Sequence, residues 1–321
     1  MAYEKKLILL LTVIFCLLCL YIGTFFIGTE KSLRNSNISW LDMNFIHLAD
    51  RIEIYGFYGR TILLRKNNIW VLREGSIDYP VRQNKVEELF RDLSRRKNYP
   101  LRSSTSDPGI FGLGEEASRI IIRAGTGIPL LDLLVGYNDV SGRDVFLRRA
   151  GQTAIRSGED IFTIYTESDP SFWYDLRIFP DLSASMVQRV HIFPLFAEQS
   201  PFTLSRRNNG WINESSGALV PRAESWLRIL INTQGENFIN TENWESEGSM
   251  VLELGDGNVR LFRVSSPDLE SSRMAVVSGA PVGGSDLVFV LSEWTIRRLW
   301  GFSFFPEDTT DNDFNIFQFA L

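Results

Sequence analysis

The sequence predicts an α+β protein: two tandem, homologous β-rich units, each with one main helix, preceded by a single N-terminal transmembrane helix. Three observations lead to this prediction. An uncharged apolar run opens the chain, the two halves of the chain repeat one pattern, and the expected strands come in groups. Grouped strands are typical of α+β folds, because strands that alternate with helices build parallel α/β sheets instead.

Residues 7–27 read LILLLTVIFCLLCLYIGTFFI, without a charged residue. A helix of this length, at about 1.5 Å per residue, crosses the roughly 30 Å hydrocarbon core of a bilayer. The run ends in bulky side chains at 25–27 where a signal-peptidase site needs small ones, so we expect residues 1–29 to be a retained anchor. The lipid bilayer is therefore the expected partner of residues 7–27.

The charges that flank the run barely orient it, because Lys5 and Lys6 precede it and Lys31 and Arg34 follow it. The short leading segment favours a cytoplasmic N-terminus, and the absence of cysteine beyond Cys19 is compatible with it. We therefore expect a single-pass protein of the cell inner (cytoplasmic) membrane, with the bulk of the chain extracytoplasmic.

Composition narrows the function further. The net charge is −6, from 33 Lys and Arg against 39 Asp and Glu, so no nucleic-acid partner is expected. Both cysteines, Cys16 and Cys19, lie in the apolar run, which leaves the remaining chain without a disulfide, a thiolate nucleophile or a Cys-ligated zinc.

The repeat begins with related strands, RIEI from Arg51 and RVHI from Arg189. The phrases RKNNIWVL and RRNNGWIN follow, with Trp70 in the first and Trp211 in the second. We interpret each phrase as a tight turn, since Asn tolerates positive φ, followed by a Trp that packs against a helix. An exposed Trp that stacks on carbohydrate is the alternative.

An amphipathic helix is predicted after each Trp, because apolar residues recur at i, i+3, i+4 and i+7. These residues are Val86, Leu89, Phe90 and Leu93 in the first copy and Ala223, Trp226, Leu227 and Leu230 in the second. The match continues with RIIIRAGTG in the first copy against SMVLELGDG in the second and ends with Trp173 against Trp300. This extended match indicates a duplication.

The expected domains are the anchor, a first repeat unit over 45–178, a second over 186–305 and an acidic tail over 306–321. FPDLSAS from Phe179 is the expected hinge between the units. In the first unit we expect a helix near 82–97 and strands over 51–58, 61–66, 69–72, 118–124, 130–136, 144–149 and 153–156.

Several stretches of the first unit carry a resemblance: RIEIYG, RKNNIWVL, the helix from Val81, the FGL of GIFGLGEEASRIII and VGYNDVSGRDVFLRR. Over about residues 49–176 they resemble the bacterial domain of unknown function 4340 family. The second unit keeps the Trp and the helix but lacks the FGL segment. The resemblance implies a membrane-anchored extracytoplasmic protein, similar to ones often encoded beside gliding-motility-type ABC transporter components, and it brings no catalytic residues.

No motif predicts a catalytic, cofactor-binding or metal site. His191 matches Glu53 in the other copy, which speaks against a shared site, and His47 is interpreted as a linker residue. The glycines of GIFGLG, from Gly109, are spaced as in neither the dinucleotide fingerprint nor the phosphate loop.

Charged clusters also receive ordinary interpretations. We interpret five acidic residues as solvated surface residues, and acid/base catalysis of a glycosidase type is the alternative. These residues are Glu115, Glu116, Glu242, Glu245 and Glu247. The cations at the end of the first helix complement its dipole, with lipid headgroups or an acidic partner as the alternative: Arg91, Arg95, Arg96 and Lys97.

The expected function is that of a membrane-anchored extracytoplasmic accessory or binding component of an ABC-type transport assembly. It is non-catalytic and cofactor-free, and ABC-type permease subunits are its candidate partners. One alternative is a cell-envelope enzyme acting on glycans, which requires a pair of carboxylates in a cleft. Another is a structural envelope spacer without a deep pocket.

Overall fold

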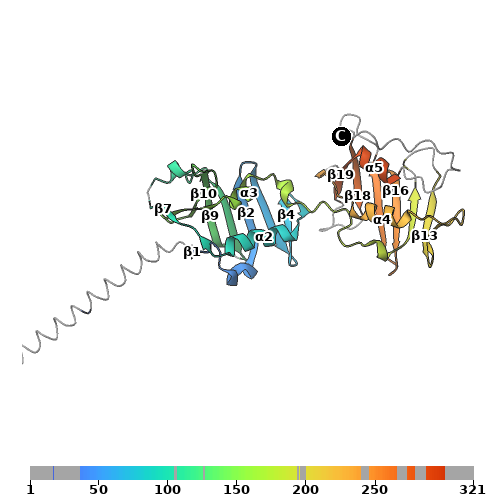
Figure 1. Cartoon of the computed structure of the whole chain (residues 1–321), viewed down its shortest axis with the longest axis horizontal. Helices are drawn as coiled ribbons and strands as arrows, with labels where there is room; N and C mark the ends of the chain where they lie inside the picture. The colour runs from blue at the N-terminus through green and yellow to red at the C-terminus, as the bar shows by residue number, and fades with distance from the viewer. Residues whose placement is uncertain are drawn as a thin grey trace, which may run out of the picture. The chain divides into compact units, whose positions relative to one another are not determined.

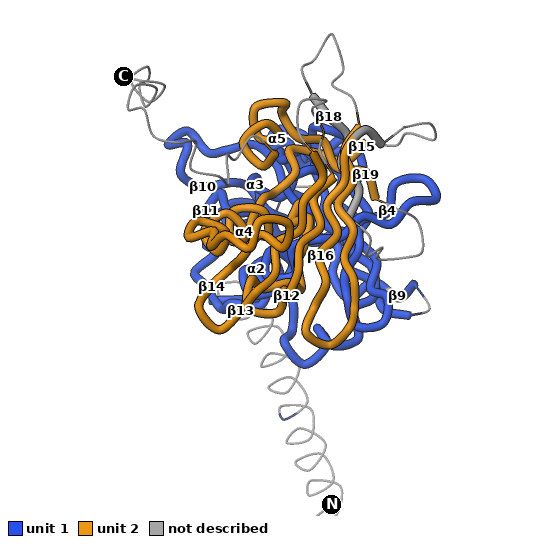
Figure 2. Tube along the Cα trace, turned by 90° about the vertical axis from the view of Figure 1, so that its right-hand side faces the viewer, with its two compact units in different colours: residues 1–174 blue, residues 175–321 orange. Residues whose placement is uncertain are grey.

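A computed structural model describes residues 37–104, 107–125, 127–193, 200–239, 246–265, 273–278 and 287–300, together with positions 17 and 195. The chain divides into two compact units, Met1–Tyr174 and Asp175–Leu321, which Figure 2 shows in different colours. The expected anchor, except for Leu17, and the expected acidic tail lie outside the described residues. Among those described, no helix has the length and apolar character to cross a membrane.

The first unit is built on a nine-stranded sheet in which all neighbouring strands are antiparallel (Figure 1). A separate strand pair joins β1 (Asn37–Ile38) to β6 (Lys97–Asn98). In spatial order the large sheet comprises β5 (Ile77–Pro80), β4 (Ile69–Glu74), β3 (Gly59–Lys66), β2 (Ala49–Gly56), β8 (Ser118–Ala124), β9 (Ile128–Asn138), β10 (Asp144–Arg149), β11 (Ile155–Glu159) and β7 (Leu101–Ser103). The β-rich α+β class is therefore confirmed.

Helices cover one face of this sheet. The helix α2 (Gln83–Ser94) crosses the strands in Figure 1 and buries the predicted stripe from Val86 to Leu93. In β2, Ile52 and Ile54 are buried toward the same side, because alternate residues of a strand point to opposite faces. The remaining helices of the unit are α3 (Ile161–Glu167), η1 (Met43–Leu48), η2 (Gly109–Phe111) and η3 (Pro170–Trp173).

The packed part of the first unit begins before residue 45, where the sequence placed its start. Trp40 and Leu41 are buried, and both backbone N–H groups donate to the carbonyl of Leu93 at 2.9 Å. At its other end the unit closes at Tyr174, ahead of the expected hinge. Phe179, the first residue of that hinge, packs against Phe262 and so lies in the core of the second unit.

The second unit has an eight-stranded sheet that is also antiparallel throughout. Its strands, in spatial order, are β14 (Gly210–Asn213), β13 (Phe202–Arg207), β12 (Val187–Phe193), β16 (Ser246–Leu254), β17 (Val259–Ser265), β18 (Arg273–Ser278), β19 (Val288–Ser292) and β15 (Asn237–Ile239). Its helices are η4 (Ala184–Met186), α4 (Ala223–Asn232) and α5 (Glu293–Trp300). The helix α4 buries the predicted apolar stripe from Ala223 to Leu230.

The two sheets follow one strand order. The run β4-β3-β2-β8-β9-β10-β11-β7 of the first unit corresponds strand for strand to β14-β13-β12-β16-β17-β18-β19-β15 of the second. The first sheet has β5 as an additional edge strand. Along the chain, the main helix comes after β5 in the first unit and after β14 in the second, and a shorter helix follows β11 or β19.

The repeated phrase forms a turn in both copies, but the positive φ falls on different residues. In the first copy Asn67 and Asn68 have φ of 49° and 65°, as expected of a tight two-residue hairpin turn. They are the only described residues other than glycine with positive φ. In the second copy Asn208 and Asn209 form the predicted turn, but Gly210 takes the positive φ, 124°, so the predicted positive φ at Asn-Asn is wrong there. Glycine adopts this conformation without steric cost.

The first basic residue of each phrase, Arg65 or Arg206, binds the 3-10 helix that directly precedes β2 or β12. Arg65 Nη1 donates to the His47 carbonyl at 3.2 Å, and Arg206 Nη2 donates to the Ala184 carbonyl at 2.8 Å. The hairpin and the chain that enters the sheet are thereby joined in both units.

The Trp of each phrase is buried, as predicted. Trp70 packs against Phe90 of α2, with ring centroids 5.7 Å apart. Trp211 donates its indole N–H to Glu224 of α4 at 2.9 Å. The interpretation of the phrase as an anchor against the helix is confirmed.

Trp211→Ala should lower the free energy of unfolding of the second unit by about 3–5 kcal/mol, because it removes a large buried ring. Trp294→Ala is the matched control, since this Trp of the same unit is 69% exposed and its loss should cost less than about 1 kcal/mol. Chemical denaturation followed by circular dichroism measures both. Equal effects of the two variants would contradict a core role for Trp211.

Candidate functional site

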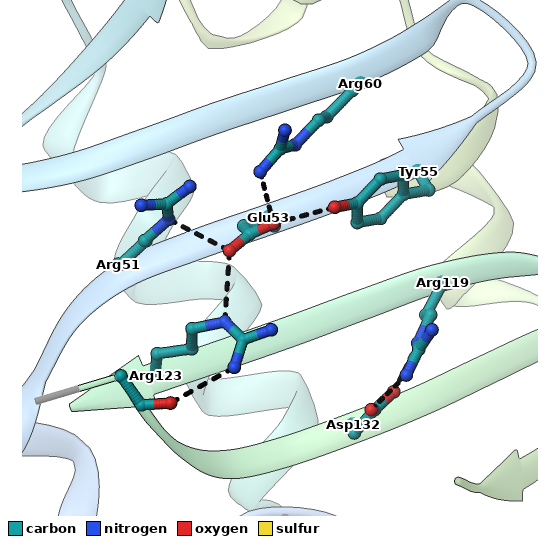
Figure 3. A network of polar contacts seen from close by, with 8 residues as sticks. Arg51, Glu53, Tyr55, Arg60, Arg119, Arg123 and Asp132 are labelled. Carbon is teal, nitrogen blue, oxygen red and sulfur yellow. Dashed lines mark hydrogen bonds and ion pairs between the residues drawn. The ribbon is translucent and has the colours of Figure 1, made fainter.

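Basic side chains gather on the face of the first sheet that α2 leaves uncovered. Strand alternation points Arg51, Glu53 and Tyr55 of β2 to this face. The cross-strand partners of Tyr55 and Arg51 add Arg60 from β3 and Arg123 from β8. Figure 3 shows these side chains from three neighbouring strands pointing toward Glu53.

The Glu53 carboxylate lies at the centre of this group, which we name the arginine cluster: Arg51, Glu53, Tyr55, Arg60 and Arg123. Its Oε2 accepts from Tyr55 at 2.8 Å and from Arg60 Nη2 at 2.7 Å. Its Oε1 accepts from Arg123 Nε at 3.0 Å and lies 2.9 Å from Arg51 Nε. Glu53 is only 4% exposed, while the side chains of the three arginines are between 31% and 44% exposed.

Glu53 is held in its charged form. Burial alone would raise the pKa of Glu53, but hydrogen bonds from Tyr55, Arg60 and Arg123 and the charge of Arg51 outweigh it and lower the pKa to about 2. Burial and the hydrogen bond to Glu53 raise the pKa of Tyr55, so its hydroxyl stays a donor. The cluster thus contains three guanidinium groups and a single carboxylate at neutral pH.

The arginine cluster lines an open groove of about 700 Å³. The lining adds Arg65 and Lys66 from the end of β3 and the turn residues Gly125 and Gly127. Five basic and two acidic residues, the latter Asp50 and Glu53, therefore line the groove, although the register places the side chain of Arg65 on the α2 face, opposite Trp70. A guanidinium presents donors in a planar fork that fits carboxylate or phosphate, so the groove favours an anionic ligand.

Part of the neighbouring charge is already neutralised. Arg119 faces Asp132 of β9 in Figure 3 and donates from Nε at 2.6 Å. Lys66 pairs with Asp78 of β5. The excess of positive charge therefore rests mainly on Arg51, Arg60 and Arg123, which share Glu53.

The second unit has a counterpart with reversed charges. The cross-strand pair of Arg51 and Arg123 corresponds to that of Arg189 and Glu253. His191, which stands where the first unit has Glu53, lies 2.7 Å from Glu253 through Nε2, and Arg189 Nη1 donates to Glu253 at 3.0 Å. Acid and base have thus exchanged strands. The sequence comparison detected the replacement of Glu53 by His191 but not that of Arg123 by Glu253.

The polarity of this second cluster differs. Arg189 also donates to Glu214 at 3.0 Å, so two carboxylates face one arginine and one histidine. The hydrogen bond from His191, supported by Arg189, lowers the pKa of Glu253. Positive charge does not accumulate here, and the two clusters therefore suit different ligands.

Other residues considered from the sequence lie elsewhere. Glu115 and Glu116 are exposed in the turn before β8, and Glu115 lines a smaller hollow of about 340 Å³. Glu242 and Glu245 lie outside the described residues, and the side chain of Glu247 is not described. His47 is exposed in η1 and contacts Arg65 through its carbonyl.

The two remaining candidates are structural. Gly112 of the GIFGLG loop has a φ of 70°, and Phe111 of the same loop packs edge-on against Phe146. At the end of α2, Arg96 donates to the Asn37 carbonyl at 3.0 Å and Lys97 pairs with Glu159 at 2.5 Å. These basic residues tie the helix end to neighbouring strands.

Sequence reasoning missed the arginine cluster. Its members come from three strands and are far apart along the chain, so only the register brings them together. The one local signal was the alternation of Arg51, Glu53 and Tyr55 with the buried Ile52 and Ile54. Polar residues are ordinary on the solvated face of an antiparallel sheet, so this alternation alone does not single out a site.

Glu53→Gln should lower the free energy of unfolding of the first unit by about 2–3 kcal/mol at pH 7, because three arginines lose their shared carboxylate. The pKa of Glu53 is depressed from 4.5 to about 2, so its contribution is complete above about pH 4.5 and is lost as pH falls toward 2. Denaturation at pH 7, 4 and 2.5 should show the gap between wild type and variant closing.

Glu253→Gln is the control for this experiment, since Glu253 is more exposed and should contribute less. A gap between wild type and Glu53→Gln that stays constant over this pH range would contradict the assigned ionisation.

Comparison with known proteins gives one family. The family model described as a domain of unknown function, DUF4340, matches residues 70–247, which is more than half of the chain. The match begins in β4 of the first unit and ends in β16 of the second. Searches of curated proteins and of solved structures found no match. With the family resemblance of the first unit thus confirmed, the chain belongs to the DUF4340 family.

Proposed function

We propose that this chain is a non-catalytic binding component that recognises an anionic group in the groove of its first unit. We further propose that residues 7–27 anchor it in the inner membrane and that it serves, outside the cytoplasm, as an accessory of an ABC-type transport assembly. The observation that carries the binding role is the convergence of three guanidinium groups on the single buried carboxylate of Glu53.

The chemistry of the groove favours binding over catalysis. A general acid or base works best when its pKa lies near the operating pH. Glu53, with a pKa of about 2 and both oxygens engaged, does not meet this condition. A glycosidase needs two carboxylates that reach one bond of the substrate, whereas Glu53 is enclosed by Arg51, Arg60 and Arg123.

The arrangement of the arginines supports recognition of an anion. Arg60 uses Nη2, and Arg123 uses Nε, to bind Glu53. A guanidinium carries five N–H donors, so neither side chain is saturated by this contact. Glu53 holds the guanidinium groups at fixed positions, which lowers the entropic cost of binding a further anion.

The proposed accessory role draws on the duplicated architecture. The common strand order and the repeated Trp phrase support descent of both units from one ancestor. Two related units on one chain offer two surfaces to a larger assembly, and a membrane anchor raises their effective concentration near a membrane partner. The identity of that partner as an ABC-type permease rests on the family resemblance alone.

Arg60→Gln should weaken binding of inorganic pyrophosphate to the full chain by about tenfold, the equivalent of one charge-assisted hydrogen bond. Arg60 suits this test because Arg51 and Arg123 still hold Glu53 in the variant. Isothermal titration calorimetry at fixed salt measures the affinity. Arg189→Gln, the matched change in the second unit, should leave it unchanged. Equal affinities in wild type and Arg60→Gln, or hydrolysis of pyrophosphate, would refute the binding role.

The transport role predicts crosslinks between the extracytoplasmic units and a polytopic membrane protein in native membranes. Replacing residues 7–27 by a cleavable signal should abolish these crosslinks, because the units are then diluted into the soluble space. Mass spectrometry of the crosslinked products identifies the partner. Full biological function of the released form would contradict an accessory role at the membrane.

A further inference from the structure

Four large apolar side chains are exposed at the end of the first sheet where the chain enters it. Met43, Phe45 and Leu48 of η1 are 69%, 48% and 46% exposed, and Ile69 at the start of β4 is 50% exposed. We name these four the apolar rim. Because η1 leads directly into β2 and the turn at 67–68 joins antiparallel β3 to β4, both segments lie at the same end of the sheet.

The apolar rim adjoins the anion groove. Arg65, which lines the groove, donates to the carbonyl of His47 within η1 at 3.2 Å. Lys66, another lining residue, pairs across the hairpin with Ile69 of the rim. Apolar and cationic residues therefore lie together at this end of the sheet, which we name the amphipathic edge.

The exposure of the rim is built into the fold. Trp40 and Leu41, immediately upstream, are fixed in the core by their bonds to Leu93. Asp42 then caps η1, accepting from the N–H of Asn44 at 2.9 Å. Since both ends of η1 are held, its apolar residues are presented outward at defined positions. Exposed apolar side chains that gather at one place are typical of interaction sites.

We propose that this edge docks on an anionic lipid bilayer: the apolar rim enters the interface and the arginine groove binds lipid phosphate. The inference rests on the proposed anion-binding function and names its ligand class. Amphipathic elements with apolar residues on one side and cations on the other bind membranes in this way.

The length of the chain favours a bilayer over other partners. Twelve residues separate Ile27, the last of the apolar run, from Trp40. Fully extended, they span about 40 Å at most. An anchor at 7–27 therefore keeps the edge within about 40 Å of the membrane surface, where lipid headgroups are the most abundant anions.

The charge around the edge is complementary to anionic lipid. Cations exceed carboxylates by two among the groove residues, their ion-pair partners and the cap of η1: Arg51, Arg60, Arg65, Lys66, Arg73 and Arg123 against Asp42, Asp50, Glu53 and Asp78. Positive charge near a surface rich in anionic headgroups is attractive, and salt weakens the attraction.

A spin label tests this docking in the full chain, reconstituted in nanodiscs of phosphatidylcholine with or without about one-third phosphatidylglycerol. Cys16→Ser and Cys19→Ser remove the native thiols, and Leu48→Cys carries the label. The measured quantity is the ratio of the label's collision rate with oxygen, which dissolves in lipid, to its collision rate with a water-soluble nickel complex. This ratio should rise at least twofold when phosphatidylglycerol is present. Phe57→Cys, at the opposite end of β2 and 82% exposed, is the matched control and should show no change.

Two variants separate this inference from the proposed function. Phe45→Ser should abolish the shift at the Leu48 label while leaving pyrophosphate binding unchanged. Arg60→Gln should reduce both the lipid-dependent shift at the Leu48 label and the affinity for pyrophosphate. If pyrophosphate binds but the label stays equally water-exposed in both lipids, the bilayer inference fails and anion binding stands. Crosslinking of the rim to a protein, without the lipid shift, would overturn the inference in favour of a protein partner.

Discussion

The carboxylate of Glu53 determines the character of the first unit. Without it, Arg51, Arg60 and Arg123 would repel one another across neighbouring strands, since like charges opposite each other destabilise a sheet. Their attraction to a common partner bridges three neighbouring strands on the open face. The same attraction orders the side chains that form the groove. Sheet stability and the proposed recognition of an anion therefore both involve one buried group.

The second unit shows how such a framework diverges. The positions of Glu53 and Arg123 are filled by His191 and Glu253, so the contact between the strands persists while its polarity is reversed. A change at one position alone would leave two acids or two bases facing each other. The paired exchange preserves the strand order and gives each unit its own surface charge.

Local patterns in the sequence predicted much of the fold. The apolar stripe from Val86 to Leu93 and the burial of Trp70 and Trp211 could be predicted, because both follow from the pattern of residues within a short stretch of sequence. The helix α3 was missed, since its sequence IFTIYTE is rich in β-branched and aromatic residues that favour strands. The short strands β5 and β7 were also missed, because their pairing depends on β4 and β11 and not on a pattern of their own. The arginine cluster needed the register, and a slip of one residue would move every member of a strand to the other face.

The way the chain enters the first unit has a mechanical consequence. Trp40 and Leu41 are bound to the end of α2, eight residues before β2 begins at Ala49. Tension on the chain upstream of these residues is therefore carried first by the hydrogen bonds to α2 and by the β1–β6 pair. The strand that bears Glu53 lies beyond this load path. A tether could move or pull at the N-terminus while the groove kept its shape.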